Sequence, residues 1–333
     1  MKIAMLGSGA WGTALATLLA HNGHEVLMWS YESEVANDIN QFHENKRYLP
    51  GVVLDKKISA TSDISQAICG VRWIFEAIPV KFLRKTLEQT VHCFSKEQVW
   101  VITSKGIEQD TLMLPSQIID DVFDYQTKQA VVAGPSFAHD LARKDITGVA
   151  VAAQDCTIAD ELQELMANLY FRPYVNLDMV GVQLAAALKN VITLGVGMLD
   201  GAGFADNAKA FIFTRGLHEM VQLGIAMGAQ KETFYGLAGV GDLALTAMGK
   251  RSRNLHVGRS LGAGQSLDHI LATTGYIPEG INTAQSLHQL MHKKQIAMPV
   301  CDGIYKVIFG TITLHDMLAD LMSISFEAKK CCS

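Results

Sequence analysis

The sequence lacks an excess of basic residues. Its 333 residues include 28 Lys and Arg against 33 Asp and Glu, a formal net charge of −5. Proteins that bind nucleic acids or anionic membranes usually carry net positive charge, so we expect neither partner. A long uninterrupted apolar run is also missing. The longest stretch, 180–199, contains Gln183, Lys189, Asn190 and Thr193. These polar residues predict a helix of a protein core and no membrane span.

Paired cysteine motifs are missing too. The six cysteines stand at positions 69, 93, 156, 301, 331 and 332, with no Cys-x-x-Cys pair and no metal-ligand spacing. We interpret them as buried or incidental thiols of a reducing cytoplasm. His288 and His292 are four residues apart, but Gln289 replaces the glutamate of a zinc-protease motif, so we expect no metal. Glycines interrupt the apolar N-terminal stretch, which argues against a secretory signal. We therefore expect a soluble, cytoplasmic protein.

Two different periodicities divide the chain. Short apolar runs predict strands at 2–6, 25–29, 73–78, 99–103, 130–133 and 148–152, and helices are predicted between them at 13–21, 80–92, 112–123 and 159–169. This alternation predicts a doubly wound, mostly parallel α/β sheet. Beyond residue 178 the pattern is helical, at 180–199, 207–227, 268–271, 283–292 and 299–309. We predict a Rossmann-type domain over 1–178 and an all-helical domain over 179–333, packed directly together.

A glycine-rich loop follows the first predicted strand. It reads Gly7-Ser8-Gly9-Ala10-Trp11-Gly12 and leads directly into a predicted helix. In a Gly-x-Gly-x-x-Gly loop, the first glycine makes a tight turn and the second lets the backbone approach a pyrophosphate. The third allows close packing of helix on strand. The pattern predicts a dinucleotide site at Gly7, Gly9, Ala10, Trp11 and Gly12, the alternative being a tight strand–helix turn alone.

The predicted strands end in residues suited to a ligand. Lys105 lies between Ser104 and Gly106 after one strand, and Gly134-Pro135-Ser136 follows the next. Ligands of doubly wound sheets bind beyond the carboxyl ends of the strands, so we place Lys105, Gly134 and Ser136 in the site. Ordinary turn chemistry and a solvated surface lysine are the alternatives.

The choice of cofactor depends on the end of the second predicted strand. Glu32 lies 20 positions beyond Gly12, where a ribose-binding acid is expected, but it is three residues past Trp29. Tyr31 is a further cofactor candidate, because its ring can stack on adenine or its hydroxyl can bond the ribose. Lys46 and Arg47 could fold back toward the end of this strand, or Arg253 could reach the nucleotide from the second domain. A basic residue in that place would favour the 2′-phosphate of NADP.

One lysine stands alone in an apolar helical stretch. Lys189 is surrounded by small and apolar residues over 181–192. Burial lowers the pKa of an ammonium group, which makes a lysine usable as a general base near neutral pH. The alternative is a lysine that extends its ammonium group to solvent from a mostly buried helix.

Two further segments of the second half are candidates for binding. Asp242 follows Gly241 and is either a site residue or a helix N-cap. Ser252-Arg253-Asn254 combines a guanidinium, a hydroxyl and an amide just before a predicted helical segment. This combination suits a phosphate, the alternative being an exposed basic loop.

Together these motifs strongly resemble the bacterial NAD(P)-dependent glycerol-3-phosphate dehydrogenase family. The resemblance covers the chain from Gly7 to about Pro299. It includes 7–16, Ser104-Lys105-Gly106-Ile107-Glu108, Gly134-Pro135-Ser136-Phe137-Ala138, Leu188-Lys189-Asn190, Asp206-Asn207-Ala208-Lys209, Gly241-Asp242-Leu243, Ser252-Arg253-Asn254 and Glu279-Gly280. The sequence departs from the family pattern at 29–32, Val80 and Pro278, and the first departure leaves the choice between NAD and NADP open.

The resemblance implies a reversible hydride transfer between sn-glycerol 3-phosphate and dihydroxyacetone phosphate. By analogy Lys189 is the proton-transferring base, Lys105 polarises the carbonyl and Asp242 holds the terminal hydroxyl. By the same analogy the substrate phosphate is bound by Ser252, Arg253 and Asn254, and the site is lined by Gly134 and Ser136. The positions that match cofactor contacts are Trp11, Lys105, Ala138, Arg253, Ile277 and Glu279. The family also implies a cytoplasmic homodimer that supplies phospholipid synthesis, with NADP(H) preferred and NAD(H) possible.

Two other functions remain open at this point. A dehydrogenase of the same two-domain plan that acts on a β-hydroxy acid would also use an arginine, for a carboxylate. A non-catalytic NAD(P)-sensing protein would keep the glycine-rich loop. It would have no need of Lys189, Lys105 and Asp242, so their presence argues against it.

Overall fold

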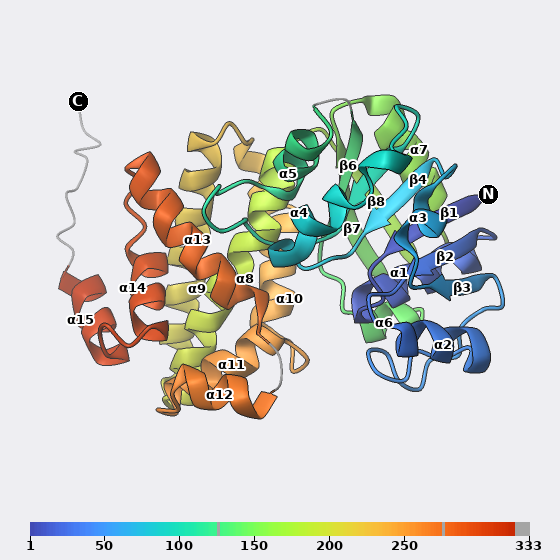
Figure 1. The fold of residues 1–333 in the computed structure, drawn as a ribbon. Coiled ribbons are helices and arrows are strands. Elements are labelled where there is room, and N and C mark those ends of the chain that lie inside the picture. The colour runs from blue at the N-terminus through green and yellow to red at the C-terminus, as the bar shows by residue number, and fades with distance from the viewer. Residues whose placement is uncertain (125–126, 275–276, 324–333) are drawn as a thin grey trace.

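The computed structural model describes residues 1–124, 127–274 and 277–323. Cys331 and Cys332 lie outside this part of the chain. Figure 1 shows two lobes side by side, a sheet with its covering helices and an assembly of helices. The sheet has eight strands in the order β3-β2-β1-β4-β5-β6-β7-β8. All neighbouring pairs are parallel except β6 and β7, so the predicted fold class is confirmed.

Most predicted strands form close to the expected positions. They are β1 (Lys2–Leu6), β2 (Glu25–Trp29), β4 (Trp73–Glu76), β5 (Val99–Ile102), β6 (Lys128–Ala133) and β7 (Thr147–Ala153). The sequence analysis did not predict β8 (Phe171–Asn176), which forms one edge of the sheet. It also missed β3 (Ile58–Thr61), a four-residue strand at the other edge whose exposure alternates. So short a segment with half-exposed residues gives almost no periodic signal.

The sheet is covered by helices on its connections. They are α1 (Ala10–His21), α2 (Ser33–Phe42), α3 (Ile64–Ile68), α4 (Val80–Glu88), α5 (Pro115–Val122), α6 (Ala138–Ala142) and α7 (Cys156–Met166), with a 3₁₀ turn η1 (Val91–Cys93) after α4. The helices α2, α3 and α6 were not predicted. Two of them have only five residues, and α2 buries just Val35, Ala36 and Ile39. These apolar stripes are too sparse to identify a helix from sequence.

The second lobe is helical among its described residues, as predicted. Its elements are α8 (Met179–Gly201), α9 (Asp206–Ala226), η2 (Lys231–Tyr235), the π-helical turn η3 (Leu237–Gly241), α10 (Asp242–Met248), α11 (Arg253–Gly262), α12 (Leu267–Thr274), α13 (Glu279–Lys294), α14 (Pro299–Ile308) and α15 (Leu314–Ser323). The Asp178 side chain caps α8 by accepting a hydrogen bond from the Gly181 amide at 2.8 Å. This N-cap fixes the start of the longest helix.

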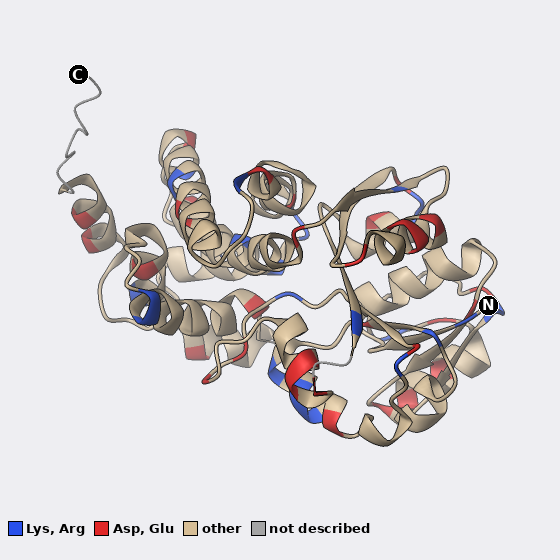
Figure 2. Ribbon diagram, turned by 90° about the horizontal axis from the view of Figure 1, so that it is seen from above, with Lys and Arg blue, Asp and Glu red and all other residues tan. Residues whose placement is uncertain are grey.

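Helix α8 joins the two lobes. It contacts β6 and β7 on one side and the helices α9, α11 and α13 on the other. It is the one described helix long and apolar enough to span a membrane, but 94% of its most apolar window is buried inside the protein. Figure 2 shows positions of basic and acidic residues in both lobes.

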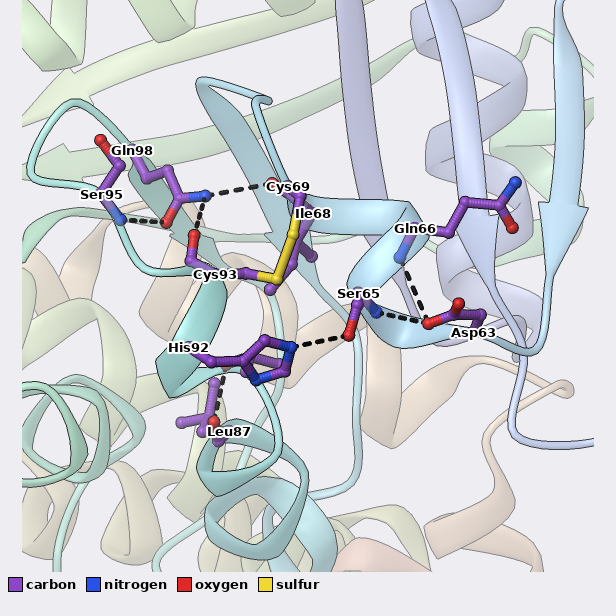
Figure 3. The surroundings of a disulfide bond; sticks show 11 residues. Asp63, Ser65, Gln66, Ile68, Cys69, Leu87, His92, Cys93, Ser95 and Gln98 are labelled. Atoms are coloured by element: carbon purple, nitrogen blue, oxygen red, sulfur yellow. Dashed lines mark hydrogen bonds between the residues drawn. A yellow bond between two sulfur atoms is a disulfide. The ribbon is translucent and has the colours of Figure 1, made fainter.

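A disulfide bond joins Cys69, at the end of α3, to Cys93 in η1 (Figure 3). Around it, the Gln98 side-chain amide donates to the Ile68 and Cys93 carbonyls at 3.1 and 3.3 Å. This pairing corrects our interpretation of these two cysteines as incidental thiols. Their sequence separation of 24 residues gives no motif, and only the sheet brings the two connections together. Cys156 and Cys301 are free thiols.

Candidate active site

The glycine-rich loop has the geometry of a nucleotide-binding turn. Gly7 has φ +107°, and a Cβ atom there would lie 2.7 Å from the Ala77 carbonyl oxygen. A Cβ atom on Gly12 would lie 2.2 Å from the Gly7 carbonyl oxygen, whereas one on Gly9 would meet no atom within 4 Å. The first and third glycines are therefore required by the packing of α1 on the sheet. Gly9 borders open space where a ligand can approach the backbone.

The surroundings of this loop fit a dinucleotide. The loop follows β1, which lies between β2 and β4 in the sheet. The chain adds β2 and β3 on one side of β1 and then β4 and β5 on the other side. Dinucleotides bind at such a switch point, where the strand order reverses. The N-terminus of α1 opens at Gly9 and Ala10, and helix N-termini favour negative charge. The Trp11 indole N–H is buried and has no hydrogen-bond partner within the described ranges. An unsatisfied buried donor beside a helix N-terminus is consistent with a missing polar ligand.

The rim of this site is set by residues after β2. Tyr31 is 84% exposed. Glu32 does not extend freely into solvent, because its carboxylate accepts a hydrogen bond from the Tyr48 hydroxyl at 2.7 Å. Arg47 folds back to within 3.8 Å of the same carboxylate, whereas Lys46 instead lies 3.9 Å from Asp38. A cation and an acid therefore stand together after β2, where the sequence analysis expected a ribose-binding group.

Four side chains form the centre between the two lobes. The Lys189 ammonium group in α8 donates to Asp242 Oδ1 at 2.6 Å and to Thr246 Oγ1 at 2.7 Å. The Lys105 ammonium group, from the loop after β5, donates to Asp242 Oδ2 at 2.9 Å. Lys189 is only 5% exposed and Asp242 only 1%. Lys189 is therefore a buried site residue, not one that reaches solvent, and Asp242 binds two lysines instead of capping α10.

The charges at this centre shift the pKa values of its groups. Burial and the nearby Lys105 charge together lower the pKa of Lys189 to about 8, against the opposing effect of Asp242. Burial would raise the pKa of Asp242, but the ammonium groups of Lys105 and Lys189 outweigh it and hold that pKa below its usual value. A lysine of this kind exchanges protons near neutral pH, which suits a general acid–base group.

A buried carboxyl group supports the loop that carries Lys105. Glu76 ends β4 and is fully buried. Its Oε1 accepts hydrogen bonds from the Ser104 hydroxyl at 2.7 Å and from the Thr103 and Ser104 amides at 3.2 and 3.3 Å. The Ile78 amide donates to Oε2 at 3.4 Å. Burial raises the pKa of Glu76 to about 8, although these hydrogen bonds oppose the shift.

The predicted phosphate segment is partly engaged within the protein. The Ser252 hydroxyl caps α11 by accepting from the Leu255 amide at 3.1 Å. The Asn254 side chain donates to Asn190 Oδ1 at 3.0 Å and accepts from the Gly280 amide at 3.1 Å. Asn254 thus ties α11 to α8 and to the start of α13. It also positions the turn after which Glu279 begins that helix.

Other predicted residues border the same region. Arg253 is exposed, and its charge opposes the upward shift that burial gives the pKa of Glu279. Lys105 and Glu279 line one cavity of about 330 Å³. The Ser136 hydroxyl donates to the Gly134 carbonyl at 2.9 Å just before Ala138 begins α6. Ile277 is 46% exposed and, like Tyr31, lies outside the hydrogen-bonded centre.

Three residues near the centre were missed by the sequence analysis. Thr246 lies one helical turn after Asp242, and Asn190 follows Lys189 directly. Their positions next to two predicted site residues could have identified them from the sequence. Glu76 was the single charged residue in an apolar strand that ends at the ligand edge. Such a residue is rare in a buried strand and deserved to be singled out.

Comparisons with known proteins agree along the whole chain. Models of the N-terminus and C-terminus of NAD-dependent glycerol-3-phosphate dehydrogenase match residues 2–159 and 178–319. A protein of Bacillus velezensis named glycerol-3-phosphate dehydrogenase (NAD(P)+) is 40% identical over 324 residues, 97% of this chain and 94% of that one. A protein of the same name from Lactiplantibacillus plantarum is 41% identical over 326 residues, 96% of each chain.

A solved structure agrees as well. The crystal structure of glycerol-3-phosphate dehydrogenase from Coxiella burnetii superposes with a TM-score of 0.92 at 31% identity. The match covers 97% of this chain and 98% of that one. Both lobes and their connection are thus shared.

Proposed function

Because the chain belongs to the NAD-dependent glycerol-3-phosphate dehydrogenase family, we propose that it interconverts dihydroxyacetone phosphate and sn-glycerol 3-phosphate. A nicotinamide cofactor, when held at the glycine-rich loop, would supply or accept the hydride at C2 of the substrate. In the direction of reduction, the Lys189 ammonium group gives a proton to the C2 oxygen as the carbonyl becomes a hydroxyl. In oxidation, neutral Lys189 takes that proton back.

The buried lysine–aspartate–lysine group is the observation that carries this proposal. Charge that develops on the C2 oxygen is stabilised by nearby fixed cations, and Lys105 and Lys189 provide two of them. Asp242 holds both ammonium groups in place and, by analogy with the family, also accepts a hydrogen bond from the terminal hydroxyl of the substrate. Thr246, one turn after Asp242 on α10, accepts a further hydrogen bond from the Lys189 ammonium group.

The phosphate of the substrate is assigned to the N-terminal segment of α11, residues 252–254, which begins at the N-cap Ser252. Arg253 offers a forked cationic donor, and the α11 N-terminus adds backbone amides. Ser252 and Asn254 complete this segment, with Gly134 and Ser136 on the opposite lobe. The engagement of Asn254 with Asn190 and Gly280 indicates that it acts mainly by holding the segment in position.

The cofactor is assigned to the switch point of the sheet. Gly7, Gly9, Ala10, Trp11 and Gly12 would hold the pyrophosphate, and Tyr31 the adenosine end. Lys105, Ala138, Arg253, Ile277 and Glu279 match family contacts to the dinucleotide. We propose, by analogy with the family, that NADP(H) is preferred and NAD(H) is used as well. Arg47 and Glu32, 3.8 Å apart, do not by themselves choose between the two cofactors.

The family resemblance supports the remaining expectations. We propose a division into domains at 1–178 and 179–333, a cytoplasmic homodimer, and a role in supplying glycerophospholipid synthesis. These proposals concern the assembly and setting of the enzyme and are independent of the residue roles above.

The decisive experiment follows consumption of the reduced cofactor with dihydroxyacetone phosphate as substrate. We expect turnover with this substrate and far less with unphosphorylated dihydroxyacetone or with a β-keto acid. Turnover mainly with the acid would favour the β-hydroxy acid dehydrogenase. Cofactor binding with no turnover on any of the three would favour the sensor protein.

A further inference from the structure

A second group of chemically reactive side chains lies on α13 and α14, on elements that do not carry the lysine centre. It consists of His288 and His292, one turn apart on α13, and Asp302 on α14. One potential ligand atom from each residue lies within 4.8 Å of the other two. His288 Nδ1 is already 3.0 Å from Asp302 Oδ1. Two imidazoles and a carboxylate therefore converge on one point of the surface.

Neighbouring residues hold this group in a fixed orientation. The His288 ring stacks on Tyr305 with a centroid distance of 4.0 Å and an interplanar angle of 10°. The Lys306 ammonium group binds Asp302 Oδ2 at 2.8 Å, so Oδ1 is the oxygen directed at the histidines. The rings of His288 and His292 meet edge to face at 4.5 Å. Partners that fix the ring and carboxylate orientation are typical of metal ligands.

From this geometry we propose that His288, His292 and Asp302 bind a divalent transition metal of the zinc type. Zinc ligands lie about 2.0–2.2 Å from the ion, and His292 is exposed, so its side chain is free to close the small remaining gap. Two nitrogen ligands and one oxygen ligand suit zinc better than magnesium, which requires oxygen ligands in octahedral geometry. A water molecule takes the fourth position.

The bound ion connects α13 to α14. The contact between His288 and Asp302 is replaced by two bonds to the metal, and a proton carried by a ligating ring nitrogen is released. Metal binding to the folded protein stabilises it. The helix α13 also begins at Glu279, so the ion fixes the far end of a helix whose first residue borders the active site. The sequence alone argued against a metal here because Gln289 replaces the glutamate of a zinc-protease motif, and it gave no sign of Asp302 on another helix.

The simpler alternative is a charge network of His288, Asp302 and Lys306 with no affinity for metal. It is tested with the full-length, chelator-treated protein and Zn²⁺ alone, by titration calorimetry and by thermal unfolding with and without the ion. We expect one Zn²⁺ per chain and a higher unfolding temperature in its presence, with no such response to Mg²⁺.

Two ligand variants make the test specific. His292→Ala and Asp302→Asn should each weaken zinc binding by at least about 10–100-fold, as the loss of even an outer-shell partner does. Both should abolish the thermal shift and keep wild-type activity. The control His269→Ala removes an exposed histidine of α12 and should bind zinc like the wild type. Absence of zinc binding by the wild type, or unchanged binding in either ligand variant, would overturn the proposal.

Discussion

The Lys189 ammonium nitrogen lies 2.6 Å from Asp242 Oδ1, and both side chains are almost wholly buried. A buried charge is costly unless it is paired and hydrogen-bonded. Lys189 and Asp242 compensate each other's charge. Lys105 donates a further hydrogen bond to Asp242, and Thr246 accepts one from Lys189. The arrangement retains a lysine whose pKa is lowered to about 8 inside an apolar helix.

Removal of this lysine should abolish turnover. Lys189→Ala deletes the proton-transferring group, an effect of roughly 10²–10⁴-fold in rate, and also the positive charge beside the developing alkoxide. Cofactor binding should stay near the wild-type level, because the glycine-rich loop is untouched. Steady-state rates and a direct cofactor titration test this together, and a variant that kept most of its activity would contradict the mechanism.

The pH dependence should have opposite signs in the two directions. Reduction needs protonated Lys189, so its kcat/KM should fall as the pH rises through about 8. Oxidation needs the neutral amine, so its kcat/KM should rise over the same range. Profiles of kcat/KM in both directions provide the measurement. Parallel profiles would show that another group limits the rate.

Glu76 has a raised pKa in the same range as Lys189, so its titration must be distinguished from that of Lys189 in the pH profiles. It also gives a separate prediction about stability. Its pKa is raised from the ordinary 4.5 to about 8 by burial, so the folded protein holds a proton that the unfolded chain loses. The contribution of Glu76 to stability is fully present below about pH 4.5 and is lost as the pH rises through about 8.

Glu76→Gln keeps the shape of the protonated side chain and cannot ionise. The unfolding temperature of the variant relative to wild type should therefore increase from about pH 5 to about pH 9, which thermal unfolding across this range measures. The alkaline limb of kcat/KM should remain, because it belongs to Lys189. A constant difference in unfolding temperature would mean that folding does not raise the pKa of Glu76.

Arg253→Ala should raise KM for dihydroxyacetone phosphate far more than it changes any residual rate with unphosphorylated dihydroxyacetone. The reason is the forked, charge-assisted contact that arginine makes to a phosphate. KM for the nucleotide is measured alongside, because the same residue matches a cofactor contact. Equal losses with both substrates would remove Arg253 from the phosphate site.

Both cofactors should support the reaction, with a moderate preference for NADPH. The values of kcat/KM for NADH and NADPH test this directly. A preference for NADH above about tenfold, roughly 1.4 kcal/mol, would reject the prediction. It would indicate that Glu32, held by Tyr48, binds the ribose hydroxyls.

The sequence by itself determined the features that depend on local chemistry. The glycine-rich loop, the buried strands around it and the change to helical periodicity near residue 178 all follow from neighbouring residues. Lys189, Lys105 and Asp242 could also be singled out, because each is a charged residue in a setting where charge is rare or faces the ligand edge. The short elements β3, α3 and α6 gave no such signal.

Tertiary structure alone decided which distant residues meet. Lys105 and Asp242 are separated by 137 positions and Lys189 and Asp242 by 53, and sequence patterns do not report such distances. The same holds for the disulfide between Cys69 and Cys93, for the support that Glu76 gives the Lys105 loop, and for Asp302 beside His288. The physical reason is that local periodicity fixes which face of an element is buried. The contacts across that face depend on how whole elements pack together.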